Sequence, residues 1–184
     1  AAQSHDGRSF VREYLQARIL HSLQTSGAMI NVAFHGGTAL RFLYRIPRYS
    51  EDLDFSLARS AGYDFERLLR KVKAKFTSEG YEVEVRMKKN SSPVDSAFVR
   101  FPGLLHQIGI SPHRDEVLAV KLDIDTNPPA GAQYATTLLT RHVTLNVHHH
   151  DSATLLAGKL NALITRSHVK GRDVYDLMWY LTQP

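Results

Sequence analysis

The stretch FHGGTALRFLYRIPRYSEDLDF, residues 34–55, joins an apolar run, two glycines, a basic segment and two closely spaced aspartates. The apolar residues 29–34 predict a short buried strand that the glycines end. Residues 38–44 predict a helix, with Thr38 near its cap position and Pro47 just beyond its end. The stretch therefore predicts a strand, a tight turn and a helix, followed by a second strand that carries the aspartates.

That second strand has two acidic side chains on one face. Residues 52–57, DLDFSL, alternate between polar and apolar, which is typical of a strand with one buried face. Asp52 and Asp54 then share one face, because residues two apart in a strand point the same way. Two neighbouring carboxylates repel each other unless a cation lies between them, and a hard divalent cation prefers such oxygen ligands. For an Asp-x-Asp by itself, a solvated acidic face is the alternative.

A second acidic strand lies far along the chain. Residues 117–125, VLAVKLDID, alternate in the same way and place Lys121, Asp123 and Asp125 on one face. If the two acidic strands are neighbours, their carboxylates converge and could hold two Mg²⁺ ions about 3.5–4 Å apart. Asp123 is the stronger candidate for a third ligand, because it lies nearer the apolar centre of the strand. Asp125 lies at the loop end and fits a solvated edge charge equally well.

The glycine pair lies where the first strand turns into a helix. Gly36 and Gly37 would let the backbone approach a phosphate closely, and the helix start offers free N–H groups and the positive end of its dipole. A tight strand–helix turn is the alternative for a glycine pair alone. Arg48 and Ser50, which precede the acidic strand, are assigned to the same nucleotide site. For Arg48 the alternative is a solvated basic face, and for Ser50 it is a simple turn.

The rest of the chain predicts a mixed sheet flanked by helices, an α+β (mixed α/β) fold. A change from strand-rich to helical composition near Asp151 predicts a catalytic domain at 1–150 and a helical part at 151–184. Residues 90–93 predict a turn. Further helices are expected at 10–25, 63–78, 152–166 and 173–183, and further strands at 81–87, 96–101, 104–110 and 142–149.

Composition narrows the classes of function. The 184 residues carry a net charge of +5 and include no cysteine, which excludes disulfides and thiolate metal sites. No apolar run approaches the roughly 20 residues that a membrane-spanning helix needs. We therefore expect a cytoplasmic protein without a membrane segment. The basic charge favours a polyanionic partner such as RNA or a nucleotide triphosphate, although a mildly basic surface is common without one.

The histidine-rich run at His148 to Asp151 does not predict a zinc site. Consecutive strand residues point to opposite faces, so these side chains cannot all bind one ion. His35, just before the glycines, is expected to be a packed histidine at the end of a strand.

The order of these features resembles the nucleotidyltransferase superfamily of the DNA polymerase β type, in which a glycine pair, an Asp-x-Asp strand and a later acid follow one another. More narrowly, the chain resembles the AbiEii/AbiGii family, the toxins of type IV toxin–antitoxin systems. The resemblance runs from about residue 34 to 181 and rests on GGTALRFLY, RYSEDLDF, LLAGKLNAL and KGRDVYDL. Residues 60–115 carry no matching motif.

The resemblance implies a role for each matching residue. Asp173 is also explained as a helix N-cap, so Asp176 is the preferred acid of the closing motif. The implied assignments are phosphate contacts from Gly36, Gly37 and Thr38, metal ligands Asp52, Asp54 and Asp123, a triphosphate contact from Lys159, and a catalytic role for Asp176.

The implied activity is Mg²⁺-dependent transfer of a nucleotidyl group from an NTP to an acceptor hydroxyl. The resemblance implies RNA as the acceptor, in particular the 3′ end of tRNA, with growth arrest in an abortive-infection system and a cognate antitoxin as partner. Two alternatives stay open. One is a nucleotide- or RNA-binding module without catalysis, and the other is a small-molecule nucleotidyltransferase of the antibiotic-modifying type.

Overall fold

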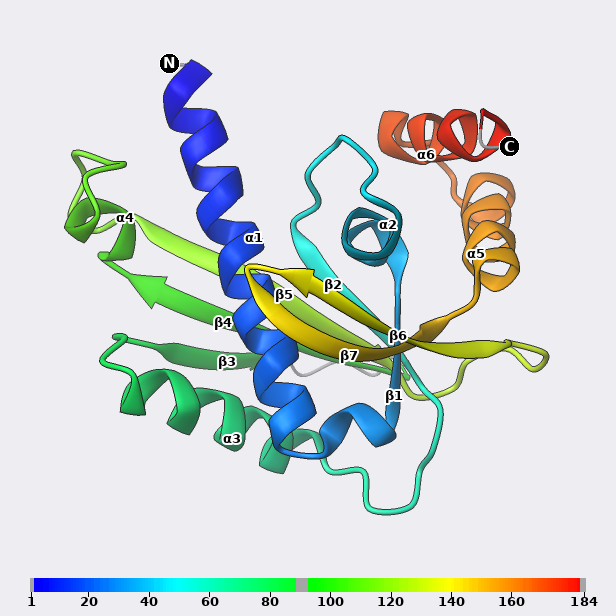
Figure 1. Cartoon of the computed structure of the whole chain (residues 1–184), viewed down its shortest axis with the longest axis horizontal. Helices are drawn as coiled ribbons and strands as arrows, with labels where there is room; N and C mark the ends of the chain where they lie inside the picture. Colours follow the sequence, from blue (N-terminus) through cyan, green and yellow to red (C-terminus); the bar gives the residue numbers. More distant parts are fainter. Residues whose placement is uncertain (1, 89–92, 183–184) are drawn as a thin grey trace.

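The computed structural model describes residues 2–88 and 93–182, and within them one mixed sheet carries the fold (Figure 1). The described strands form a seven-stranded sheet in the order β3-β4-β5-β2-β1-β7-β6. The strands are β1 (Val32–His35), β2 (Asp52–Leu57), β3 (Glu84–Lys88), β4 (Val94–Pro102), β5 (Val117–Asp125), β6 (Tyr134–Arg141) and β7 (Val143–His150).

The topology places the two acidic strands side by side. β2 pairs with β5 in parallel and with β1 in antiparallel orientation, so β2 lies between them. β1 in turn pairs in parallel with β7, although the two strands lie far apart in the sequence. The β3–β4, β4–β5 and β6–β7 pairs are antiparallel. The predicted mixed sheet flanked by helices is confirmed. The acidic strands are neighbours, which is the condition under which their carboxylates were expected to converge.

The helices differ in how they contact the sheet. Figure 1 shows α1 crossing the sheet, with α3 beside it, whereas α5 and α6 lie together near α2. Apolar residues of α1, α2 and α3 join Leu53 and Phe55 of β2 in one buried core. The helices are α1 (Ala2–Thr25), α2 (Gly36–Tyr44), α3 (Phe65–Ser78), α4 (Leu104–Gln107), α5 (Ser152–Thr165) and α6 (Gly171–Leu181), with a 3₁₀ turn η1 (Ala28–Ile30).

Two predicted strand segments were wrong. Residues 29–30 belong to η1, which follows Gly27 in the left-handed region at φ 78°, and the strand begins only at Val32. The segment 104–110 forms α4 and a turn instead of a strand. Gly103 and Gly109 both adopt positive φ, and the amide N–H of Ile110 donates to the carbonyl of Leu105, which folds the apolar run back on itself.

One strand escaped prediction. β6 has mostly exposed side chains in no regular alternation, so it lacks the period of a half-buried strand. The predicted turn at 90–93 lies outside the described residues except for Pro93. The predicted division after residue 150 falls between β7 and α5, but Leu155 of α5 joins the common core, so a separate domain stays a prediction. Within residues 2–88 and 93–182, no helix combines the length and apolar character needed to cross a bilayer.

Candidate active site

The sheet brings the predicted acids together by its register. Asp54 of β2 lies directly opposite Asp123 of β5 on one side and opposite His35 of β1 on the other. Asp52 lies opposite Lys121 of β5. The neighbouring residues of β2 and β5 that point to the other face, such as Leu53 and Leu122, are fully buried. Burial of the apolar face therefore fixes the register and leaves the carboxylates on the face toward α5.

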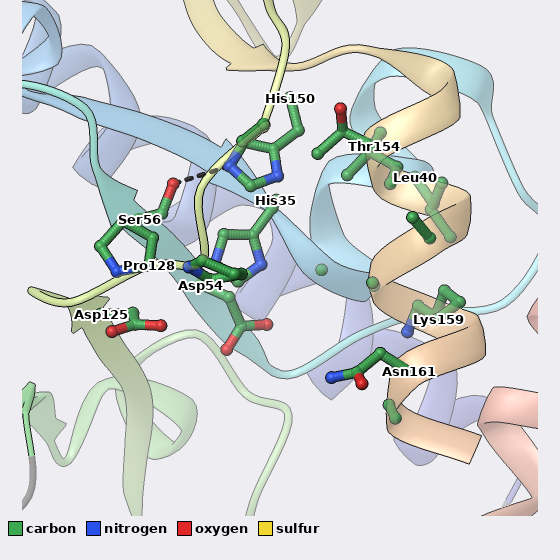
Figure 2. A pocket seen from close by; sticks show the side chains of 18 of the residues that line it. His35, Leu40, Asp54, Ser56, Asp125, Pro128, His150, Thr154, Lys159 and Asn161 are labelled. Carbon is green, nitrogen blue, oxygen red and sulfur yellow. Dashed lines mark hydrogen bonds between the residues drawn. The ribbon is translucent and has the colours of Figure 1, made fainter. Parts of the chain in front are cut away.

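A cleft of about 790 Å³ opens over this face of the sheet. Figure 2 shows Asp54 near its centre, with Ser56, Asp125 and His150 on one side and Lys159 on helix α5 across from it. Basic residues gather on the helical side of the cleft, where the lining includes Arg48, Lys159, Arg166 and Arg172. The cleft thus has an acidic wall made of strands and a basic wall made mainly of the C-terminal helices.

The ionised carboxylates of the acidic wall are destabilised by burial and by one another. Burial raises the pKa of Asp54, and the charge of Asp123 raises it further, while Lys159 and Arg172 lower it in part. Burial also raises the pKa of Asp52, with Asp54 as the next cause. Both carboxylates therefore gain from any added positive charge. Paired carboxylate oxygens in a partly desolvated cleft fit a hard divalent cation such as Mg²⁺ by their donor chemistry.

Asp123 is held by partners of its own. Ser96 Oγ donates to its Oδ1 at 2.6 Å, and Lys121 Nζ donates to its Oδ2 at 2.5 Å. Across the described ranges 2–88 and 93–182, no group of three or more His, Asp or Glu side chains is arranged to hold a metal ion. Asp52 and Asp54 thus form the half-buried acid pair of the cleft, whereas Asp123 is paired with Ser96 and Lys121.

The two glycines fit positions where a side chain would collide. Gly36 has a φ of 78°, and a Cβ there would lie 2.3 Å from Oδ2 of Asp54. A Cβ on Gly37 would lie 2.7 Å from a guanidinium nitrogen of Arg48 and 2.9 Å from the hydroxyl oxygen of Ser50. The glycine pair therefore lets the start of α2 approach the acids and the predicted nucleotide-site residues closely.

Thr38 has a structural place beside this turn. Its side chain is fully buried, and its hydroxyl donates to the backbone carbonyl of Asp52. The N-cap residue of α2 is His35, and Thr38, expected near the cap position, lies inside the first turn of the helix. The Thr38 hydroxyl thus joins α2 to the first residue of the acidic strand.

Asp176 joins the two walls through buried ion pairs. Its side chain is fully buried and accepts from Nε and Nη2 of Arg48 at 2.6 and 2.5 Å. Lys159 Nζ lies 2.8 Å from the same carboxylate. Asp176 is thus a shared buried partner of Arg48 and Lys159, and its catalytic role stays a prediction.

Asp173 has a similar place one turn earlier. It is 1% exposed and pairs with Arg166 and, at 3.5 Å, with Lys159. The expected N-cap role is wrong, since α6 begins at Gly171 and Lys170 is its cap residue. Both acids of the closing motif thus hold basic side chains of the cleft.

Two histidines line the cleft that the sequence did not assign to it. The rings of His35 and His150 stack with centroids 5.0 Å apart, and His150 Nε2 lies 2.6 Å from Ser56 Oγ. Burial lowers the pKa of both, to about 4 for His150, so both rings are neutral at pH 7. His149 points to the other face, where it is buried against Thr137, which confirms the alternation expected of the histidine run.

Other residues at the site also escaped prediction. Arg166 and Arg172 line the basic wall, and Arg172 lowers the pKa of Asp52 and Asp54. Arg172 lies within the KGRDVYDL motif, so that motif was its available signal. Lys121 was visible beside Asp123 on the alternating strand, but its ion pair could not be inferred from the alternation alone.

Solved structures support the fold. The crystal structure of a putative nucleotidyltransferase from H. pylori is similar, with a TM-score of 0.65 and 22% identity, over 93% of this chain and 67% of that one. The crystal structure of JHP933 from Helicobacter pylori is similar with a TM-score of 0.61 and 21% identity, over 93% of this chain and 65% of that one. This chain thus spans about two-thirds of their length. A comparison with curated proteins gives no match.

Sequence likeness adds the family. The profile described as "Nucleotidyl transferase AbiEii toxin, Type IV TA system" matches residues 18–184, which include the glycine turn, both acidic strands and the closing helices. Because this match covers most of the chain and the acids, glycines and basic helices meet in one cleft, the chain belongs to the AbiEii nucleotidyl transferase toxin family of type IV toxin–antitoxin systems.

Proposed function

We propose that this nucleotidyltransferase moves a nucleotidyl group from an NTP to a hydroxyl of RNA, in particular at the 3′ end of tRNA. The observation that carries the proposal is the cleft itself, in which paired acids face a basic wall and the start of α2 lies between them. The acids suit the reacting centre, and the basic wall suits a polyphosphate.

The triphosphate has a seat at the start of α2. This helix has nine residues and begins at Gly36, so its first N–H groups and its dipole favour an anion there. Arg48 and Lys159 line the same cleft and supply positive charge beside it. Together they hold the triphosphate and offset the charge that collects on the leaving pyrophosphate.

Asp52 and Asp54 are the proposed ligands of Mg²⁺, with Asp123 as the third ligand. A bound divalent cation supplies positive charge that lowers the pKa of the acceptor hydroxyl and stabilises the phosphates. In the transfer, the acceptor oxygen bonds to the α-phosphorus and the bond to the β-phosphate breaks, releasing pyrophosphate. The hydroxyl proton passes to a carboxylate of the acidic wall, for which Asp123 is the candidate, or to water.

The biological setting follows from the family. A type IV toxin is expected to arrest growth and to be countered by a cognate antitoxin. Transfer to tRNA would take place in the cytoplasm, where the acceptor and the NTP are found.

The test is transfer of label from each of the four NTPs to total tRNA in the presence of Mg²⁺. We expect label on the RNA 3′ end with the unaltered protein, and none with Asp52→Asn or Asp54→Asn. Asp95→Asn is the matched control. It lies on β4 opposite Ile124, on the other face of the sheet, and accepts a hydrogen bond from Tyr63.

Three outcomes separate the alternatives. Label on small hydroxyl compounds but not on RNA would favour the small-molecule enzyme. RNA or NTP binding that survives in both acid variants, without any transfer by the unaltered folded protein, would favour a binding module. Transfer that persists in Asp54→Asn would contradict the assignment of the acids.

A further inference from the structure

The third predicted metal ligand, Asp123, is already paired with a basic side chain of its own strand. Lys121 and Asp123 lie two residues apart on β5, on the same face, with Nζ and Oδ2 2.5 Å apart. Ser96 Oγ on β4 donates a hydrogen bond to the other carboxylate oxygen, Oδ1, at 2.6 Å. Both oxygens of Asp123 are therefore occupied by donors from the protein.

The same lysine lies against the acid pair. The register places Lys121 opposite Asp52 and Asp123 opposite Asp54. The Lys121 ammonium thus faces all three carboxylates, and Lys159 and Arg172 act on the acid pair from the other wall. A lysine in this place balances charge much as a metal ion would, although with one positive charge instead of two.

The pair of Lys121 and Asp123 is only partly buried. Its side chain is 29% exposed and that of Asp123 is 20% exposed, so water reaches the pair. A partly exposed ion pair contributes little net free energy, and the four-carbon stem of lysine lets the ammonium swing toward solvent. A divalent cation can therefore displace it without rebuilding the sheet.

We propose that Lys121 is a resident counter-ion of Asp123 that a divalent cation must displace, so that Lys121 sets how tightly the site binds the cation. This inference deepens the proposed function and rests on its acid site. It also explains why no three-acid group is arranged for a metal within the described residues. Oδ2 of Asp123 becomes open to a cation when the Lys121 ammonium moves away.

The test measures cation binding directly, by titration of metal-free protein with Mn²⁺ in a calorimeter and by the electron paramagnetic resonance signal of free Mn²⁺. Lys121→Met keeps the length of the stem and removes the charge. We expect it to lower the Mn²⁺ dissociation constant about five-fold, the ratio for an ion pair at the upper end of the partly exposed range. Lys121→Arg keeps the charge and is expected to stay within about two-fold of the unaltered protein.

A double variant shows whether the effect acts through Asp123. We expect Asp123→Asn to weaken Mn²⁺ binding, and Lys121→Met to give no tightening in that background. Lys121→Gln serves as a second neutral variant, and far-ultraviolet circular dichroism reports the fold of each.

The outcomes separate this inference from the function. Unchanged or weaker Mn²⁺ binding by folded Lys121→Met and Lys121→Gln overturns the inference alone, provided that the unaltered protein binds Mn²⁺ and transfers label. Tightening that persists in the Asp123→Asn background also overturns it. Absence of Mn²⁺ binding by every variant overturns both this inference and the metal premise of the proposed function.

Discussion

The two walls of the cleft are built by different forces. The acidic wall consists of strands whose other face is packed into the core, where Leu53 and Leu122 have no exposed surface. The basic wall depends on α5 and α6, in which Leu155 is the buried apolar residue and Trp179 and Tyr180 pack partly buried against the core. The buried residues of α6 are Asp173 and Asp176, while its apolar side chains include Met178, which is 62% exposed.

Helix α3 makes the contrast clear. It buries apolar side chains such as Leu69 and Phe76 and keeps its charged side chains outside, as an amphipathic helix does. Helix α6 instead buries Asp173 and Asp176 completely, while its Trp179 and Tyr180 are only partly buried against the core. Apolar burial and the hydrogen-bond ladder therefore place the acids, whereas ion pairs place the cations. The first arrangement is insensitive to charge substitutions in the helices, and the second depends on them.

The largest expected effect is a loss of transfer activity when the acidic wall loses one charge. Asp54→Asn keeps the shape of the side chain and removes the charge, so transfer should fall by at least about 10³-fold, equivalent to several kcal/mol of lost transition-state stabilisation. The rate of label transfer to tRNA measures it, with Asp95→Asn as control. A loss smaller than about ten-fold would contradict the role of Asp54.

The same variant has an opposite effect on stability. Because the pKa of Asp54 is raised, the folded state keeps this proton at pH values where the unfolded state has lost it. Stability then falls as the pH rises above the ordinary carboxyl range. In Asp54→Asn this pH-dependent loss of stability should be absent. The variant should therefore unfold at a higher temperature than the unaltered protein at pH 7. Melting curves from pH 4 to 8 check the sign.

The next largest effect is expected when the basic wall loses its buried carboxylate. Asp176→Ala leaves Arg48 and Lys159 without their buried carboxylate, which costs about 3–5 kcal/mol for a broken buried pair. We expect the amides of α6 to exchange with deuterium much faster, while those of α3 stay protected. The KM for NTP should rise, because two cleft cations lose their anchor. Equal protection of α6 in both proteins would refute docking by charge.

A third variant tests the junction of the walls. Gly36→Ala places a Cβ 2.3 Å from the Asp54 carboxylate and strains a φ of 78°, which alone costs about 1–2 kcal/mol. Gly62→Ala is the matched control, since Gly62 has the same φ of 78° and open space around it. We expect urea unfolding to show a larger loss for Gly36→Ala, and only that variant to lose transfer. Equal losses would mean that the turn needs glycine for its φ alone.

The smallest effect concerns the surface of α5. Gly158 lines the cleft within this helix, and a Cβ there meets nothing within 4 Å. Gly158→Ala should stabilise the helix by about 0.5–1 kcal/mol and raise the melting temperature. An increase in KM at unchanged kcat would show that the substrate packs against this turn of α5. An unchanged KM would place the substrate on the acidic wall.

The acidic wall could be predicted from the sequence because its signals are local. Strict alternation in β2 and β5 assigns each aspartate to a face, and the apolar partners fix which face is buried. The glycine turn was predictable for the same reason. The pairing of β2 with β5 needed only one assumption about neighbours, which the register confirms.

The basic wall could not be predicted in this way. Arg48 and Asp176 are 128 residues apart, and nothing in either segment names its partner. An aspartate near a helix start is explained as a cap by local rules, which is why the burial of Asp173 escaped notice. The short helix α4 was missed because its apolar run has no period, and only the positive φ of Gly103 and Gly109 decides it.

The pairing of β1 with β7 has a consequence for the timing of synthesis. Phe34 lies opposite His149, so the central strand β1 keeps an open edge on the ribosome until β7 has been made. Lys159 and Asp176 emerge later still. Asp52 and Asp54 are therefore synthesised before the residues of the basic wall. A growing chain cannot form the complete cleft until synthesis has passed α6.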